Sequence, residues 1–155
     1  MGCLVTEQID FPVEENLPPK IIADPERNPL QRILVFNLGD ETTPGDTELE
    51  IVVTIRDPNV EDELQWRAFM NLDDTLGVPQ GWETGGRIQP SSVEDRPHSF
   101  QVPGSAFGID PGCRRIDLLV SKQFRSPEAD ILPVEPGDID RATWWVNVRT
   151  VDEGG

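Results

Sequence analysis

The chain has 155 residues, of which 36% are hydrophobic and 27% charged, so its composition is that of one ordinary globular domain rather than a disordered chain. Its 29 acidic and 13 basic residues give a formal charge of −16. So acidic a surface repels phosphate backbones and excludes nucleic acid as an expected partner.

The first thirty residues show neither helical nor strand periodicity and are rich in proline, which favours an extended backbone. We expect an extended, proline-rich N-terminal tether over residues 1–30 and a folded domain over residues 31–152. Within the tether, Gly2-Cys3 resembles the end of a bacterial lipobox, in which a small residue precedes an acylated cysteine. The resemblance implies that the signal peptide is removed and that a lipid on Cys3 holds the protein to a membrane. It also implies a cell-envelope location, facing the periplasm or the cell surface, for example at the outer membrane.

Other fates of the N-terminus stay open. Met1, Gly2 and Thr6 match the N-myristoylation pattern, and Cys3 could then carry a palmitoyl chain. That alternative predicts a dual-acylated intracellular protein anchored to a membrane. The terminus could also be unmodified. A disulfide between Cys3 and Cys113 would exclude lipidation, because both uses consume the same sulfur.

Beyond the tether, apolar side chains recur with a period of two, which is typical of strands that bury one face. Turn-forming residues, Gly85-Gly86 among them, separate the expected strands, and a short helical turn fits 103–107 or 126–129. The expected strands are 32–38, 49–56, 64–70, 98–102, 115–120 and 142–148. The residues expected to face inward on the four clearest strands are Leu49, Ile51, Val53, Ile55, Leu64, Trp66, Ala68, Met70, Ile116, Leu118, Val120, Trp144, Val146 and Val148.

Residues 51–67 resemble the B strand, acidic turn and C strand of immunoglobulin-like envelope domains of the PKD-like and cadherin-like kinds. The resemblance implies that Trp66 is the core aromatic of strand C, and that 113–120 and 142–148 are strands F and G. We therefore expect an all-β fold, an immunoglobulin-like antiparallel β-sandwich of about seven strands. The chain has no tyrosine, so it lacks the tyrosine corner of true immunoglobulin domains.

The acidic turn is the densest group of oxygen ligands, and calcium binds six to eight oxygens. The candidate calcium ligands are Asp57, Asn59, Glu61 and Asp62. This pattern suggests an alternative function, a calcium-stiffened cadherin-like adhesion or interaction domain. The other interpretation is a solvated turn in which the Asp57 side chain caps the backbone.

Little in the sequence points to catalysis. His98 is the single histidine, which excludes multi-histidine zinc sites, and no Gly-x-Ser-x-Gly motif occurs. Cys113 could act as a nucleophile only beside a base in an electropositive setting. We expect a non-enzymatic protein without a cofactor, calcium excepted, and keep a hydrolase with acidic catalytic residues as a rival.

Two tryptophans are candidates for partner contacts. Trp82 lies in an expected loop, and Trp145 lies on the less buried face of a strand. Such aromatic residues often anchor a partner, although either could instead pack against the sandwich. The sequence thus predicts a non-catalytic envelope lipoprotein that acts as a binding or structural module, with a protein or an envelope polymer as its partner.

Overall fold

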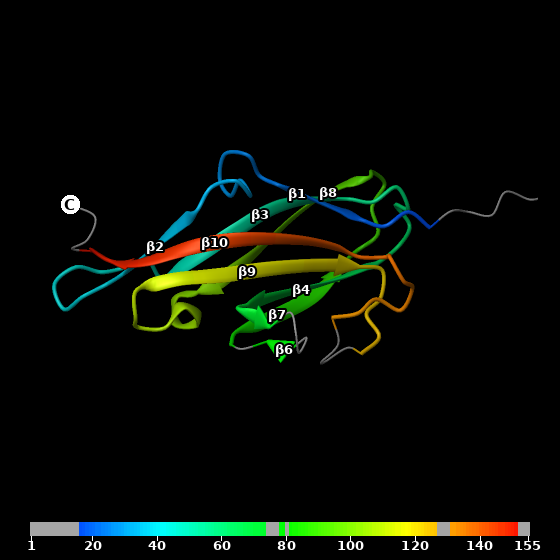
Figure 1. Cartoon of the computed structure of the whole chain (residues 1–155). Helices are drawn as coiled ribbons and strands as arrows, with labels where there is room; N and C mark the ends of the chain where they lie inside the picture. Colours follow the sequence, from blue (N-terminus) through cyan, green and yellow to red (C-terminus); the bar gives the residue numbers. More distant parts are fainter. Residues whose placement is uncertain (1–15, 74–77, 80, 127–130, 152–155) are drawn as a thin grey trace, which may run out of the picture.

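The regular structure of the described residues is almost entirely β-strand. A computed structural model describes residues 16–73, 78–79, 81–126 and 131–151 (Figure 1). Its elements are β1 (Lys20–Ala23), β2 (Leu34–Leu38), β3 (Glu48–Arg56), β4 (Leu64–Met70), β5 (Leu72–Asp73), β6 (Val78–Pro79), β7 (Glu83–Ile88), β8 (Asp95–Pro103), the 3-10 turn η1 (Gly104–Phe107), β9 (Gly112–Ser121) and β10 (Asp140–Thr150).

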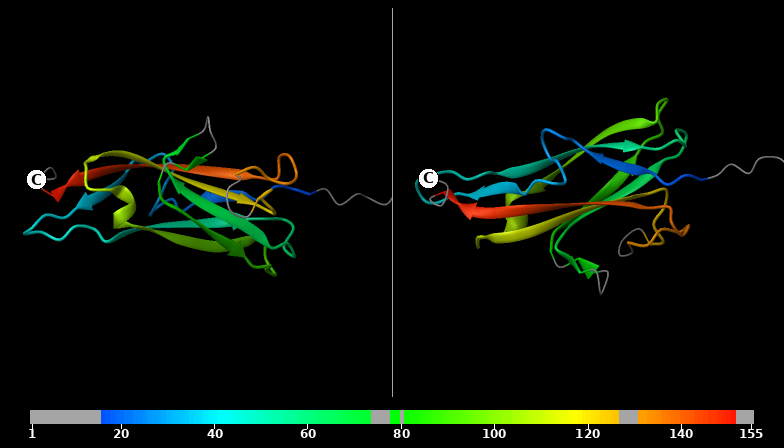
Figure 2. Two further views of the ribbon diagram at one scale, coloured as in Figure 1. Left: turned by 90° about the horizontal axis from the view of Figure 1, so that it is seen from below. Right: turned by 45° about the horizontal axis from the view of Figure 1, so that its top comes forward.

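Two sheets face each other as the layers of a sandwich (Figure 2). One has the strand order β1-β3-β8 and the other β2-β10-β9-β4-β7, while β5 and β6 form a small separate hairpin. The paired strands are antiparallel, except that β2 runs parallel to β10. This is the order of immunoglobulin-like strands A-B-E and A′-G-F-C-C′. The predicted all-β, immunoglobulin-like sandwich is therefore confirmed.

The predicted period-two pattern describes the core well. Twelve of the fourteen residues expected to face inward are buried, and the other two, Leu49 and Trp66, are partly buried side chains that pack against the main apolar cluster. Trp144 is fully buried, and its indole Nε1–H donates to the Asn28 carbonyl at 2.8 Å. Burial of these side chains supplies the main driving force for folding.

The sandwich begins earlier than the predicted boundary at residue 31. Lys20–Ala23 forms β1, which pairs with β3. Asn28 is 3% exposed, and its side chain donates to the Glu50 carbonyl and accepts from the Val52 N–H. A four-residue strand offers too short an alternation to be recognised in a proline-rich segment. Residues 1–15, with Cys3, lie outside the described residues.

Gly85 and Gly86, predicted to form a turn, lie in the middle of β7. A Cβ on Gly85 would stand 2.7 Å from the Trp66 carbonyl oxygen, and a Cβ on Gly86 would stand 3.1 Å from the Trp66 Nε1. Glycine is present here because strand β4 approaches closely, not because the chain reverses. The helical turn expected at 103–107 is confirmed by η1. Its alternative at 126–129 lies mostly outside the described residues.

Candidate functional site

The acidic turn between β3 and β4 surrounds the guanidinium group of Arg96. Arg96, on β8, is 4% exposed, and one of its terminal nitrogens lies 3.4 Å from an Asp57 carboxylate oxygen. The two terminal nitrogens also donate, over 2.7 to 3.3 Å, to backbone carbonyls of Asn59, Val60, Asp62 and Gln89. Its Nε is buried and has no hydrogen-bond partner among the described residues.

Asp57 is thereby committed to a structural role. The carboxylate is 1% exposed and accepts the Asn59 backbone N–H at 3.0 Å. Burial raises the pKa of Asp57, while the Asn59 N–H and the Arg96 charge act in the opposite direction. The guanidinium takes the place that a cation would need, surrounded by carbonyls and one carboxylate.

The remaining predicted calcium ligands share a surface hollow with a lysine. Asp62 forms an ion pair with Lys122 at 2.9 Å, which raises the pKa of that lysine. Asn59 and Glu61 line a shallow surface hollow of about 340 Å³ with Asp62 and Lys122. Within the described ranges, no three histidine, cysteine or acidic side chains are grouped as metal ligands.

Asp138 lies near this end of the sandwich and is only 6% exposed. One carboxylate oxygen accepts the Lys122 backbone N–H at 3.2 Å, and the other has no partner among the described residues. Burial raises the pKa of Asp138, and the negative charge of Glu135 adds to the effect. The buried charge therefore costs stability at neutral pH.

A second buried carboxylate organises the outer face of the five-stranded sheet. Asp117 is fully buried and lies on β9, the strand that pairs with β10 on one side and with β4 on the other. It accepts from Arg115 and Arg141 at 2.9 Å and from the Thr143 hydroxyl at 2.7 Å. The sequence offered a weak signal, an acid alone between apolar residues, but its arginine partners are evident only from the strand register.

Trp145, a predicted partner-binding residue, lies on that outer face and is 51% exposed. Its neighbour across the sheet on β9 is Arg115. On the other side β2 runs parallel to β10, with Val35 level with Asn147. Ile33 and Val35 are 61% and 41% exposed. We call Ile33, Val35 and Trp145 the apolar patch.

Trp82, the other predicted partner-binding residue, has a different environment. Its side chain is half-buried and packs against the main apolar cluster, and its carbonyl accepts the Met70 N–H at 2.8 Å. This placement matches the packing alternative for Trp82. Trp145, in contrast, leaves about half of its surface in solvent.

His98 and Cys113 lie in separate environments, one facing the interior and one on the surface. His98 faces the interior, where its ring meets Trp66 edge-on at 4.7 Å, and burial lowers the His98 pKa. Its Nε2 has no partner among the described residues. Cys113 is an exposed free thiol, and its register neighbour on β10 is Asn147 rather than a base.

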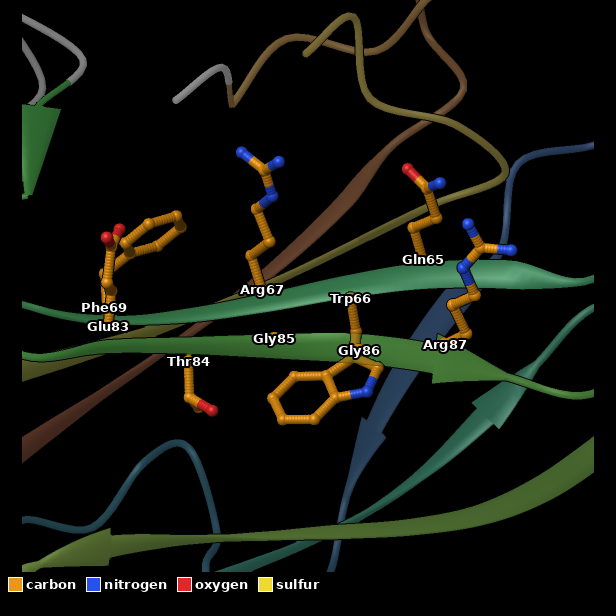
Figure 3. A pocket seen from close by; sticks show the side chains of 9 residues that line it. All are labelled: Gln65, Trp66, Arg67, Phe69, Glu83, Thr84, Gly85, Gly86 and Arg87. Carbon is orange, nitrogen blue, oxygen red and sulfur yellow. The ribbon is translucent and has the colours of Figure 1, made fainter. Parts of the chain in front are cut away.

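A shallow groove of about 370 Å³ runs over β4 and β7. Figure 3 shows Gln65, Arg67 and Arg87 on one side of these strands and the Trp66 ring on the other. Between Glu83 and Arg87, the glycines of β7 project no side chain, which leaves the strand's backbone accessible.

No protein-family model and no curated protein match the sequence. Among solved structures, the chain is similar to the CARDB domain of the PF1109 protein from Pyrococcus furiosus, which was crystallised in complex with di-metal ions. The TM-score is 0.46 and the identity 14%, over 86% of this chain and 92% of that one. Similarity of this size assigns no family. The fold nevertheless defines an immunoglobulin-like sandwich domain. Among the described residues, no helix is long and apolar enough to cross a membrane.

Proposed function

We propose that the protein is a non-catalytic binding module that contacts a protein or envelope polymer through the apolar patch. The observation that carries the proposal is the exposure of Trp145, at 51%, next to the strand that carries exposed Val35 and is preceded by exposed Ile33. Tryptophan and arginine are enriched among residues that dominate binding energy, and Arg115 lies directly across from Trp145.

The patch sits on a rigid support, which favours recognition without induced folding. Arg115, Arg141 and Thr143 are all bonded to the buried Asp117 carboxylate, so the strands beneath the patch are tied together. The inward neighbours Trp144 and Val146 are fully buried. A preorganised surface loses less conformational entropy when it binds.

We further propose that a lipid on Cys3 anchors this module in the cell envelope, as the Gly2-Cys3 motif suggests. The first described residues and the end of β10 lie at opposite ends of the sandwich (Figures 1 and 2). In a domain anchored by its N-terminal end, the long axis of the sandwich would therefore point away from the membrane, and the faces of the sheets would point sideways, along the membrane plane. The patch would stay accessible to a neighbouring molecule.

Site-specific photo-crosslinking tests the binding surface. A photoreactive amino acid replaces Trp145 in the full-length protein, expressed in cells that naturally make it. The control position is Ile109, which is 89% exposed but lies in the loop before β9. We expect a discrete adduct from position 145 and none of that mass from position 109. Equal adduct patterns at the two positions would argue against the patch.

Mass spectrometry of the membrane-extracted native protein tests the anchor. We expect a diacylated N-terminal peptide that begins at Cys3, and a Cys3→Ser variant that leaves the membrane fraction. A peptide that begins at Gly2 with a myristoyl group would instead support the dual-acylated alternative. An unmodified peptide would refute both.

A further inference from the structure

Strand β7 ends the five-stranded sheet, so in the part of the chain that the structure describes one of its edges has no neighbouring strand. Such an edge presents backbone N–H and C=O groups that can pair with another chain. Its four central residues include Gly85, Gly86 and Arg87, all exposed. As far as the described residues go, the edge is thus open as well as unpaired.

The other end strands are protected in the ways that proteins commonly use. β8 contains Pro97 and Pro103, and β1 has only four residues. The outer edge of β2 is bonded by Asp46, which donates its N–H to the Asn37 carbonyl and accepts the Asn37 N–H. β7 has six residues and no proline or lysine.

The sequence of β7 is complementary to itself. In an antiparallel pair of two copies centred on Gly85, Gly85 faces Gly85, Thr84 faces Gly86, and Glu83 of each copy faces Arg87 of the other. Residues directly opposite in such a pair share a face of the sheet, so both charge pairs form on the outer face. The glycines at the centre let the two backbones approach without side-chain crowding.

Local charge does not oppose this pairing. Each copy carries −16 overall, but Arg87 is bonded to Glu63 at 2.8 Å, and Glu83 and Arg67 are the other charged side chains along the groove. At an ionic strength of 0.15 M, charges more than about 8 Å apart are largely screened. The electrostatic energy of the contact is therefore set mainly by the charges near β7, which balance one another.

We propose that two copies of this chain pair through β7 and form one continuous sheet across a two-fold axis. The interface is isologous, because the same strand contributes both halves. This inference does not depend on the apolar patch, which involves the strands at the far edge of the same sheet.

Sedimentation velocity of the full chain, from micromolar concentration to about 1 mM, tests the proposal. We expect a reversible dimer. Glu83→Arg and Arg87→Glu should each weaken dimerisation by about tenfold or more, because each turns two attractive pairs into repulsive ones. The double reversal should recover much of the lost affinity but not all of it, because Arg87→Glu also replaces the Arg87–Glu63 ion pair by two like charges.

The controls carry the same change in net charge at exposed positions away from β7. Glu41→Arg matches Glu83→Arg, and Arg32→Glu matches Arg87→Glu. Neither control should weaken the dimer as the β7 variants do. If a β7 variant fails to fold, amide exchange in the wild type still reports the interface. Successive N–H groups of a strand point to opposite edges, so one of the Gly85 and Gly86 amides faces β4 and the other faces the free edge. The amide at the free edge should exchange more slowly as concentration rises.

Three results would overturn the proposal. The first is a wild-type chain that stays monomeric up to about 1 mM. The second is a dimer whose stability the charge reversals leave unchanged. The third is a double reversal that dimerises no better than Arg87→Glu alone, since both variants lose the Arg87–Glu63 pair and differ only in the charge pairs between the two copies.

Discussion

Arg96→Met isolates the contribution of the buried guanidinium to the acidic turn. Methionine retains an unbranched apolar stem but loses the charge and the donors to four carbonyls and Asp57. Removing one partner of a buried ion pair costs about 3–5 kcal/mol. Four lost hydrogen bonds at about 1 kcal/mol each give a similar figure. We therefore expect a loss of about 4 kcal/mol, out of the roughly 5–15 kcal/mol of an ordinary domain.

Urea unfolding followed by tryptophan fluorescence measures this loss, with Arg96→Lys as the charge-retaining control. Lysine should recover part of the stability, because an ammonium cannot reach all the carbonyls that the planar guanidinium bonds. Without Arg96, the pKa of Asp57 rises further, so the folded variant binds a proton more tightly than the unfolded chain does. The deficit should therefore shrink as pH falls through the folded pKa of Asp57. A variant within about 1 kcal/mol of wild type, or a deficit that grows in acid, would refute the reasoning.

Three further predictions follow from the burial and contacts of other side chains. Asp138→Asn should stabilise the protein by about 1 kcal/mol at neutral pH, since it removes a charge that burial penalises. That gain should vanish below the folded pKa of Asp138, where the wild-type carboxyl is protonated and uncharged; urea unfolding at several pH values checks both statements. Trp144→Ala should cost about 3–5 kcal/mol and Trp145→Ala less than about 1 kcal/mol in the same assay, because the first side chain is fully buried and the second is half in solvent. Calcium at about 1 mM should move the melting temperature by less than about 1 °C, because Arg96 occupies the centre of the acidic turn; a clear rise in scanning calorimetry would contradict this.

Period-two patterning was sufficient to predict the strands that form the centre of the sandwich. β3 and β10 alternate between buried and more exposed residues over most of their length. β4 and β9 also bury the expected face, but Phe69, Asp117 and Leu119 on their other face are buried as well. β1 was missed because four residues carry too little pattern. β7 was missed because paired glycines are typical of turns, whereas here their role depends on contact with Trp66 on the neighbouring strand.

The candidate sites, too, could be predicted only where local sequence is sufficient. The acidic turn was correctly recognised as a cluster of oxygen groups, but its counter-charge comes from Arg96, 39 residues after Asp57 in the chain. Pairing over that distance depends on strand register, which local sequence does not reveal. Trp145 could be placed on the less buried face from alternation alone, whereas the packing of Trp82 against the core depends on the loop's path.

The central claim is that the surface around Trp145 is covered by a partner where the protein works. Hydroxyl-radical footprinting compares the oxidation of Trp145 in native envelopes with that in the purified full chain, with half-buried Trp66, which packs inward against His98, as the internal reference. We predict that Trp145 is oxidised several-fold less in envelopes, while the oxidation of Trp66 is unchanged. Equal oxidation of Trp145 in both preparations would contradict the account.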